Sequence, residues 1–478
     1  MTISAVSLAG DGNYEPASDT AEIVIGKATA SAVATGGSFT YDGQPHGGTC
    51  SVTGVGGSVL PATTTYSTGG VPVNAGTHTI TCSFAGDGNY EPATDSADIV
   101  IGKAAASAVA TGGSFTYDGQ PHGGACRVTG IGSDVLAGVT TYSTGTAPVN
   151  AGSHTITCSF AGDGNYDPAS DTAEIVIGKA TPVIHLTAPS TTYTAAPYAG
   201  ATCSAEGVAG ASLPAALGFE DAAHASLGGA PIDAGGYFAA CVFAGDGNYT
   251  AASGTAAFTI APKALTVTAT DAAIVLGAPT PAFSVTYAGF AGADGPASLG
   301  GTVTFTFTGI APTAYPASTT APTGAGAYTV APSGLTSGNY ALTFAPGTYR
   351  ITYAAGGLCL GSEGHAILPP IANTGRTVVK ANSTVPAKFR VCDAFGNSVA
   401  TAGVVRAFHL VQIIAGTVVS DVNDTVASTT PDAAFRWSAT DQLWIFNINT
   451  KGMQADRTYV FLITLDDGSV IPFQFGLR

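Results

Sequence analysis

Residues 77–84 read Thr-His-Thr-Ile-Thr-Cys-Ser-Phe, and this stretch indicates the fold of the chain. Ile80, Cys82 and Phe84 occupy alternate positions, with hydroxyl-bearing residues between them. Because successive side chains of a strand point to opposite faces, the pattern predicts a half-buried β-strand. The composition agrees, since 64 glycines and a charged fraction of only 10% favour strands and tight turns over helices.

The strand belongs to a repeat that runs through most of the chain. Ala-Gly-Asp-Gly-Asn-Tyr occurs at residues 9–14, 85–90, 161–166 and 244–249 and, as the weaker echo Ser-Gly-Asn-Tyr, at 337–340. Gly-Asp-Gly-Asn predicts a tight hairpin turn, because glycine and asparagine tolerate positive φ angles. Short strands separated by such turns predict an all-β fold in which each repeat is a two-sheet sandwich.

The repeats predict a tandem array of modules. Its segments are a partial module with only the closing hairpin at 1–27, modules at 28–103 and 104–179, a diverged module at 180–262, a cysteine-free module at 263–354 and a terminal β domain at 355–478. Because residues 1–27 match only the tail of a module, we expect the sequence to begin in mid-repeat. Linkers as short as Gly26-Lys27 predict a monomeric rod with limited bending.

Eight cysteines fall in pairs, one pair in each of four segments. The pairs are Cys50 with Cys82, Cys126 with Cys158, Cys203 with Cys241, and Cys359 with Cys392. Cys82 lies on the apolar face of its strand and Cys50 shares parity with Val52, so both should point inward, and we predict one disulfide across each core. Buried free thiols are the alternative, whereas the absence of a Cys-x-x-Cys pair disfavours zinc. Since disulfides persist in oxidising compartments, the protein is expected outside the cytoplasm, secreted or at the cell surface.

Charge and motifs exclude several classes of function. A formal net charge of −16 disfavours nucleic acid and anionic lipid as partners, and no stretch approaches the ~20 apolar residues of a membrane span. The sequence carries no Gly-x-Ser-x-Gly, phosphate loop or His-Glu-x-x-His. Near-identical copies build length or multivalency, whereas catalysis needs a unique constellation. We therefore predict that the chain has no catalytic residues, binds no cofactor and is not an enzyme.

Four histidines are candidate metal ligands. His46 and His78 recur as His122 and His154, each four residues before a cysteine. However, Asn-Ala-Gly-Thr-His at 74–78 aligns with Asp-Ala-Gly-Gly-Tyr at 233–237 and Gly-Ala-Gly-Ala-Tyr at 324–328. A ring that alternates between histidine and tyrosine favours packing at a corner of the sandwich over metal binding.

Two other groups leave alternatives open. Asp11, Asn13 and Glu15, with Asp19 nearby, space their oxygens like the start of a calcium loop, but they lack the sixth-position glycine and twelfth-position glutamate of an EF-hand. A plain hairpin turn is favoured, and calcium remains the alternative. Trp437 and Trp444 would form a sugar-stacking platform if exposed; the first shares parity with Phe435 and the second with Phe446, which favours core packing.

Several motifs resemble those of known families. Tyr41-Asp42-Gly43, the Asn-Ala-Gly turn and the Gly-Asp-Gly-Asn-Tyr hairpin resemble the immunoglobulin-like repeats of bacterial surface proteins and adhesins, over residues 1–262. Residues 263–354 resemble the MBG-type repeat, through Lys263-Ala-Leu-Thr-Val-Thr-Ala, Tyr287-Ala-Gly-Phe, Gly326-Ala-Tyr-Thr-Val and Gly338-Asn-Tyr. From about residue 360 the chain resembles the bacterial Pro-x-Lys-Phe domain, through Ser383-Thr-Val-Pro-Ala-Lys-Phe-Arg and Phe446-Asn-Ile-Asn-Thr-Lys-Gly.

These resemblances imply an immunoglobulin-like fold in every module, an extracellular bacterial setting and no catalysis. They favour a structural or adhesive stalk. The alternative is an accessory region of a larger secreted hydrolase that binds carbohydrate. The partner of either would be a surface ligand, glycan or protein, which the sequence does not name.

Overall fold

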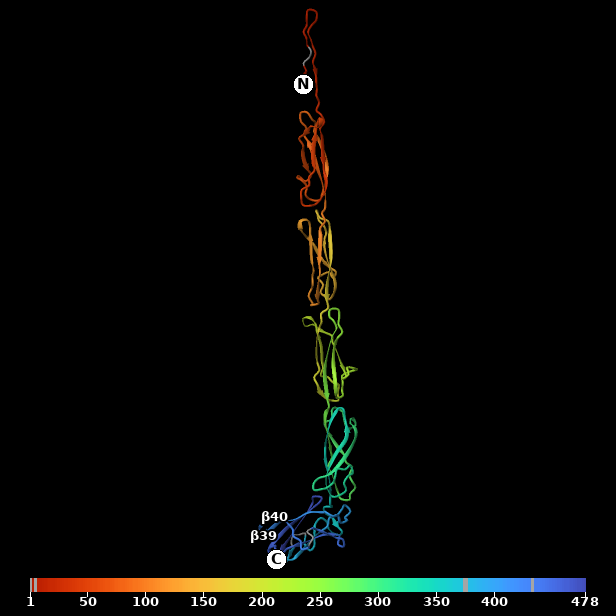
Figure 1. The fold of residues 1–478 in the computed structure, drawn as a ribbon, viewed down its shortest axis with the longest axis vertical. Coiled ribbons are helices and arrows are strands. Elements are labelled where there is room, and N and C mark those ends of the chain that lie inside the picture. Colours follow the sequence, from red (N-terminus) through yellow and green to blue (C-terminus); the bar gives the residue numbers. More distant parts are fainter. Residues whose placement is uncertain (1, 4–6, 373–376, 431–433) are drawn as a thin grey trace. The chain divides into compact units, whose positions relative to one another are not determined.

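The computed structural model describes residues 2–3, 7–372, 377–430 and 434–478. Within these ranges the chain consists of β-strands, loops and short 3-10 turns, and no α-helix is present (Figure 1). No helix in the described part is long and apolar enough to cross a membrane. The chain is an all-β tandem array of immunoglobulin-like β-sandwich modules, as the sequence predicts.

The chain packs as two compact units. The first comprises Met1–His185, Cys203–Ala216 and Cys241–Gly254, and the second comprises Leu186–Thr202, Leu217–Ala240 and Thr255–Arg478. The division passes through the segment 180–262, which contributes strands to both units. The module boundaries drawn from the repeats stay predictions.

The first unit opens with two small antiparallel pairs of strands. They are β1 (Thr2–Ile3) with β4 (Ala21–Glu22), and β2 (Ser7–Leu8) with β3 (Ala17–Ser18). Residues 7–27 are all exposed.

Residues 28–103 form a sandwich of two sheets. One sheet has the order β5 (Ser31–Thr35), β7 (Thr49–Thr53), β8 (Val59–Leu60), and the other has the order β6 (Gly37–Thr40), β11 (Ala93–Gly102), β10 (Gly76–Phe84), β9 (Thr63–Tyr66). A 3-10 turn, η1 (Val55–Gly57), links β7 to β8. The stretch quoted first lies in β10, where Ile80, Cys82 and Phe84 are buried, which confirms the predicted alternation.

Residues 104–179 repeat this plan strand for strand. One sheet has the order β12 (Ser107–Thr111), β14 (Ala125–Thr129), β15 (Val135–Leu136), and the other has the order β13 (Gly113–Thr116), β18 (Ala169–Gly178), β17 (Gly152–Phe160), β16 (Val139–Tyr142), with η2 (Ile131–Ser133) between β14 and β15. In both segments the first strand of the larger sheet pairs in parallel with the last strand of the segment: β6 pairs with β11, and β13 pairs with β18.

Residues 180–262 keep the plan with one added strand. One sheet has the order β19 (Val183–Thr187), β21 (Thr202–Glu206), β22 (Ser212–Leu213), and the other has the order β20 (Thr191–Thr192), β26 (Ala252–Ala261), β25 (Gly235–Phe243), β23 (Ala216–Glu220), β24 (Ser226–Leu227), with η3 (Val208–Gly210) between β21 and β22. β24 extends the second sheet by pairing with the end of β23.

In the second unit, residues 263–354 form another two-sheet sandwich. One sheet has the order β29 (Val285–Ala288), β27 (Lys263–Ala269), β32 (Tyr340–Ala345), and the other has the order β28 (Ala272–Val275), β33 (Gly347–Thr352), β31 (Gly326–Thr336), β30 (Gly300–Gly309), with η4 (Pro296–Ser298) before β30. Its core is largely aromatic, with Phe307, Tyr328 and Tyr349 buried together.

Residues 355–478 form a larger sandwich. One sheet has the order β36 (Ile367–Leu368), β38 (Thr384–Phe389), β42 (Leu443–Asn449), β41 (Arg436–Ser438), and the other has the order β37 (Val378–Val379), β44 (Val470–Leu477), β43 (Arg457–Leu465), β39 (Val405–Ala415), β40 (Val418–Thr425). A hairpin of β34 (Leu358–Cys359) and β35 (Ser362–Glu363) precedes them.

Candidate functional site

Three disulfides join the two sheets of a sandwich. Cys50 on β7 bonds Cys82 on β10, and Cys126 on β14 bonds Cys158 on β17, with Cα–Cα distances of 5.1 and 5.0 Å. Cys203 on β21 bonds Cys241 on β25 in the same way. The strands of each pair belong to different sheets, so the bond fixes one sheet against the other through the core.

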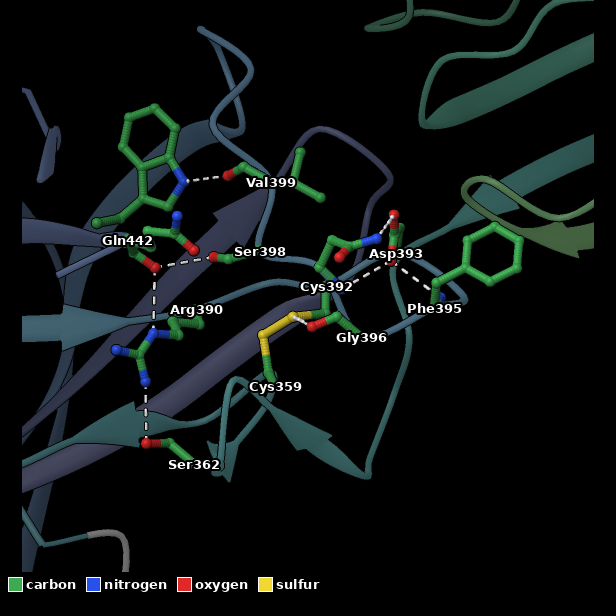
Figure 2. The surroundings of a disulfide bond; sticks show 12 residues. Cys359, Ser362, Arg390, Cys392, Asp393, Phe395, Gly396, Ser398, Val399 and Gln442 are labelled. Atoms are coloured by element: carbon green, nitrogen blue, oxygen red, sulfur yellow. Dashed lines mark hydrogen bonds between the residues drawn. A yellow bond between two sulfur atoms is a disulfide. The ribbon is translucent and has the colours of Figure 1, made fainter. Parts of the chain in front are cut away.

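The fourth disulfide has a different position. Cys359 on β34 bonds Cys392, which follows β38, and so ties the small hairpin to a loop outside the two sheets (Figure 2). Arg390 reinforces this connection by donating from Nη1 to Ser362 Oγ (2.9 Å) and from Nε to the Gln442 carbonyl (3.1 Å). The expectation of a bridge across every core is therefore wrong here: this bond braces the edge of the domain. All eight cysteines are paired and none is free.

The histidine–tyrosine exchange has a common structural role. His78 Nε2 donates to the Asn74 carbonyl (2.8 Å), and His154 Nε2 donates to the carbonyl of Asn150. Tyr237 OH donates to the Asp233 carbonyl (2.9 Å), again four residues earlier. Either ring therefore braces the same loop, which begins with Asn or Asp followed by Ala-Gly, and the corner-packing interpretation holds.

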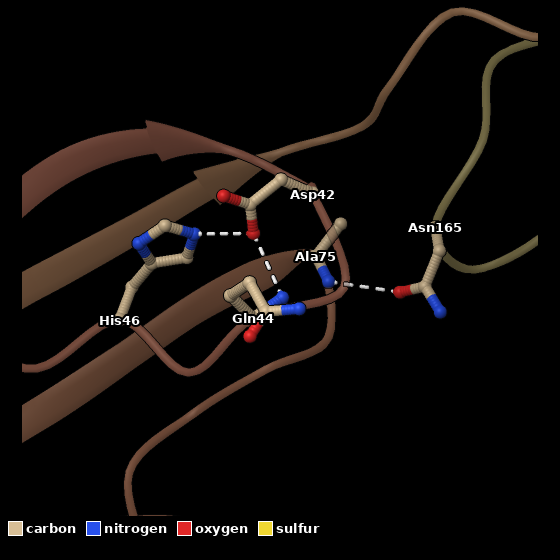
Figure 3. A network of polar contacts seen from close by, with 5 residues as sticks. All are labelled: Asp42, Gln44, His46, Ala75 and Asn165. Carbon is tan, nitrogen blue, oxygen red and sulfur yellow. Dashed lines mark hydrogen bonds and ion pairs between the residues drawn. The ribbon is translucent and has the colours of Figure 1, made fainter. Parts of the chain in front are cut away.

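The second pair of histidines is paired with carboxylates. His46 Nε2 lies 2.9 Å from Asp42 Oδ1 (Figure 3). The His46 ring also stacks on Phe39, with ring centroids 4.4 Å apart. The backbone N–H of Gln44 and the His46 side chain both bond the carboxylate and lower the pKa of Asp42. His122 repeats the arrangement. Each imidazole therefore braces a turn.

The carboxylates of the candidate calcium loops cap hairpin turns. Asp11 Oδ1 accepts from the backbone N–H groups of Asn13 (2.8 Å) and Tyr14 (3.2 Å), and Asp87, Asp163 and Asp246 do the same in their turns. Glu15 and Asp19 take no part in these contacts. Within the described ranges, no three histidine, cysteine or acidic side chains gather as metal ligands.

The asparagine of the turn capped by Asp163 contacts the preceding module. Asn165 Oδ1 accepts from the backbone N–H of Ala75 (2.9 Å) (Figure 3). Asn165 Nδ2 also donates to Asn74 Oδ1 (3.2 Å). The next residue, Tyr166, is buried and meets Tyr41 edge to face, with ring centroids 5.4 Å apart. We call this set of contacts the clasp: an Asn-Tyr pair of one module against an Asn-Ala-Gly loop and a tyrosine of the module before it.

The clasp recurs at the next junction of the first unit. Asn248 Oδ1 accepts from the Ala151 N–H (2.9 Å) and its Nδ2 donates to Asn150 Oδ1 (3.2 Å). Tyr249 meets Tyr117 edge to face at 5.3 Å. A third copy of the clasp lies inside the second unit.

In the second unit Asn339 fills the same role. Its Oδ1 accepts from the Ala234 N–H (2.7 Å) and its Nδ2 donates to Asp233 Oδ1 (2.9 Å). Tyr340 meets Tyr193 edge to face at 5.4 Å. The geometry thus persists although Asp replaces Asn in the loop and Ser-Gly replaces Asp-Gly in the turn.

This third clasp carries an additional acceptor. Both tyrosines donate to Asp294 Oδ2, Tyr193 at 2.9 Å and Tyr340 at 2.6 Å. Burial, followed by the bond to Asp294, raises the pKa of Tyr193 to about 12. Two charge-assisted bonds on one carboxylate hold this junction more tightly than rings alone.

The junction with the terminal domain uses a different network. Tyr353 donates from its backbone N–H to Asp467 Oδ2 (2.9 Å) and from its hydroxyl to Asp466 Oδ1 (2.7 Å). Burial raises the pKa of Asp466 and of Tyr353. Arg406 of the terminal domain also donates to the Pro312 carbonyl (2.8 Å).

The two tryptophans pack against the core of the terminal domain. Trp444 is only 6% exposed and donates from Nε1 to the Val399 carbonyl (3.0 Å). Trp437 lies opposite it across β41 and β42, is half-buried and packs on the same core. Core packing is therefore the correct interpretation of Trp444, and no flat pair of indoles faces solvent.

The clasp was not predicted from the sequence. Gly-Asp-Gly-Asn was expected to form a hairpin turn, and the Asp caps account for that turn, so the recurrent asparagine and tyrosine had no predicted role. The signal was present: Asn-Ala-Gly and Gly-Asp-Gly-Asn-Tyr recur together, although neither motif needs the other to form its own turn.

Comparisons with known proteins identify one part of the chain. Residues 265–350 match the family profile of the MBG domain (YGX type), as expected for the segment 263–354. No curated protein matches the chain.

Similarity to solved structures is slight. The N-terminal four Ig domains of Dscam1 isoform 4.44 are 9% identical (TM-score 0.19, 68% of this chain, 99% of that chain). Domains 1–6 of the surface layer protein SbsC are 14% identical (TM-score 0.19, 86% of this chain, 59% of that one). A SusE-like, surface-located polysaccharide-binding protein of the Bacteroides thetaiotaomicron heparin utilisation locus is 10% identical (TM-score 0.16, 94% and 99%). Scores this low establish no shared arrangement or activity.

Proposed function

We propose that the chain is a non-catalytic structural or adhesive stalk on the outside of a bacterial cell. The observation that carries this proposal is the clasp, which joins successive sandwiches by the same contacts at three junctions. Contacts repeated with so little change fix how one module follows the next, as a spacer requires. The four disulfides support an oxidising, extracellular location.

The proposal includes the module boundaries predicted from the repeats, a monomeric rod, and a terminal domain of the Pro-x-Lys-Phe type at 355–478. The acidic composition supports the proposal. A formal net charge of −16 favours solubility of a secreted chain and repels phosphate groups. The proposal also holds that the chain has no catalytic residues.

Small-angle scattering of the whole chain tests it. Wild type should scatter as an extended monomer. The triple variant Asn165→Ala, Asn248→Ala, Asn339→Ala should show a broader and shorter distribution of interatomic distances, because each junction loses its carboxamide contacts. Asn89→Ala is the matched control, since that asparagine occupies the same place in its repeat without a clasp. A compact wild-type particle would refute the stalk, and an unchanged triple variant would refute the role of the clasp.

A cavity in the terminal domain supports a second candidate function, ligand binding as an accessory region of a secreted hydrolase. The cavity has a volume of about 470 Å³, within the range of ligand pockets. Asp424, Asn449, Lys451 and Gln454 line it together with Met453 and Tyr459. This mixture of hydrogen-bonding and apolar side chains suits a glycan.

A glycan array probed with the whole chain tests this second candidate. Binding should be lost in Lys451→Ala and kept in Lys380→Ala, a lysine outside the cavity, with both variants melting like wild type. Absence of glycan binding by the wild-type chain, or equal loss in both variants, would reject the candidate.

A further inference from the structure

The cavity of about 470 Å³ in the terminal domain has an apolar floor and a charged rim. Leu410, Tyr459 and Phe461 form the floor and are 6%, 4% and 0% exposed. The Tyr459 hydroxyl is engaged by the backbone of Gln454, since it accepts from the Gln454 N–H (2.8 Å) and donates to the Gln454 carbonyl (3.2 Å). The floor therefore offers a ligand apolar contact.

Two exposed side chains of opposite charge line the same cavity. Asp424 lies on β40, and Lys451 lies in the loop that follows β42. Among the described residues, no hydrogen bond or ion pair engages the Asp424 carboxylate or the Lys451 ammonium. Asp421 on the same strand differs, because its carboxylate accepts from Gln412 Nε2 (2.9 Å). Asp424 and Lys451 are therefore free to meet the charges of a ligand.

The loop that carries Lys451 is held in place by its own contacts. The Lys451 backbone N–H donates to Asn449 Oδ1 (2.9 Å), and the Met453 N–H donates to the Thr450 carbonyl (3.1 Å). Thr450 is fully buried, and its hydroxyl donates to the Ser383 carbonyl (2.8 Å). Because the loop is already ordered, binding of a ligand loses little free energy in ordering it.

We propose that this cavity selects a sugar unit that carries both an ammonium and a carboxylate group. The inference rests on the second candidate function, glycan binding at this site, and names the class of glycan. Lys451 attracts the carboxylate and Asp424 attracts the ammonium, while the apolar face of the sugar ring lies on the floor. Asn449 Nδ2, which donates to no described residue, adds a donor for a sugar hydroxyl.

The opposite charges of the rim disfavour simpler ligands. A neutral sugar would displace water from both charges and replace only part of the hydrogen bonds that water makes. An acidic sugar would meet Asp424 as a like charge, and an amino sugar would meet Lys451 as a like charge. A ligand with both charges is matched on both sides of the cavity.

Isothermal titration calorimetry of the whole chain with four oligosaccharides of equal length tests the proposal. De-N-acetylated hyaluronan carries amines and carboxylates, hyaluronan carries carboxylates alone, chitosan carries amines alone, and chitin carries neither charge. At about pH 6 the amines and the carboxylates are both ionised. De-N-acetylated hyaluronan should bind about three- to tenfold more tightly than either singly charged probe, and chitin should bind more weakly than de-N-acetylated hyaluronan.

Two substitutions separate the contributions of the two charges. Asp424→Asn should remove the advantage that amines give a probe, and Lys451→Gln should remove the advantage that carboxylates give. Asp421→Asn and Lys388→Gln are the matched controls, because both side chains lie outside the cavity, and they should bind the four probes like wild type. A measurement without substitution is added: in about 0.5 M salt the advantage of the doubly charged probe should fall below about twofold.

Equal affinity of the wild-type chain for all four probes would overturn this inference and leave glycan binding by the cavity standing. An advantage of the doubly charged probe that survives in both Asp424→Asn and Lys451→Gln would also overturn it, since the charges would then act elsewhere. If no probe binds, the inference fails, and the glycan array shows whether glycan binding fails with it.

Discussion

Replacing Cys126 and Cys158 together with alanine should bring the segment 104–179 close to unfolding. The bond closes a loop with a sequence separation of 32, and the chain-entropy relation assigns such a loop about 3.7 kcal/mol at 25 °C. Cys158 is fully buried against Val128 and Phe160, so losing the sulfurs also leaves a cavity that costs about 1 kcal/mol. The sum of about 4–5 kcal/mol is comparable to the whole stability of many domains.

Native-state hydrogen exchange at the amides of β17 and β18 measures this loss. Protection there should fall by about a thousandfold, since each 1.4 kcal/mol is a factor of ten. The neighbouring segment 28–103, with the same plan and its own bond, is the internal reference and should change little. Ser159→Ala, on the same strand, controls for substitution itself. A loss of protection below tenfold at β17 would show that the bond does not brace the sandwich.

Three further changes should have smaller effects. His154→Leu should speed exchange in the loop that begins at Asn150 by about tenfold, through loss of one hydrogen bond, whereas His154→Tyr should not; equal effects would refute the bracing role. Hydrogen bonds from the Gln120 backbone N–H and from His122 lower the pKa of Asp118 below its ordinary value of 3.8. The ionised carboxylate therefore stabilises the fold at pH values above 3.8, and this contribution is lost as the pH falls through the lowered pKa. Asp118→Asn should therefore flatten the melting temperature of the segment below about pH 4, and an unchanged acid slope would contradict it. Trp444→Phe should lower stability by about 1–3 kcal/mol in urea unfolding, through lost burial and a lost indole bond; a neutral result would argue against its place in the core.

Sequence patterns predicted what depends on neighbours along the chain. The alternation of apolar and hydroxyl-bearing residues in 77–84 was enough to place Ile80 and Cys82 in the core. Alternate side chains of a strand share one face, so only the apolar set can point inward. Recurrence likewise showed that His78 and Tyr237 share a role before any bond was known. The particular acceptor, a carbonyl four residues back, required coordinates.

Contacts through space escaped prediction. Asn165 and Ala75 are far apart in sequence, and nothing in either turn indicates that they meet. The position of the bond between Cys359 and Cys392 also escaped, because a two-residue strand carries no alternation from which a face can be read. The carboxylate of Asp11 has the spacing of a cation ligand, yet two backbone N–H groups of its own turn satisfy it.

The chemistry of the first two clasps has a consequence for the surroundings in which the chain works. Carboxamides, a backbone N–H and tyrosine rings make these contacts, and none of those groups carries a full charge. Dissolved ions screen charges and act little on such neutral pairs. The clasp contacts themselves should therefore depend little on salt concentration. Any salt dependence of these two joints should come from the ammonium groups of Lys103 and Lys179, which donate to the Asp163 and Asp246 carbonyls across the same junctions.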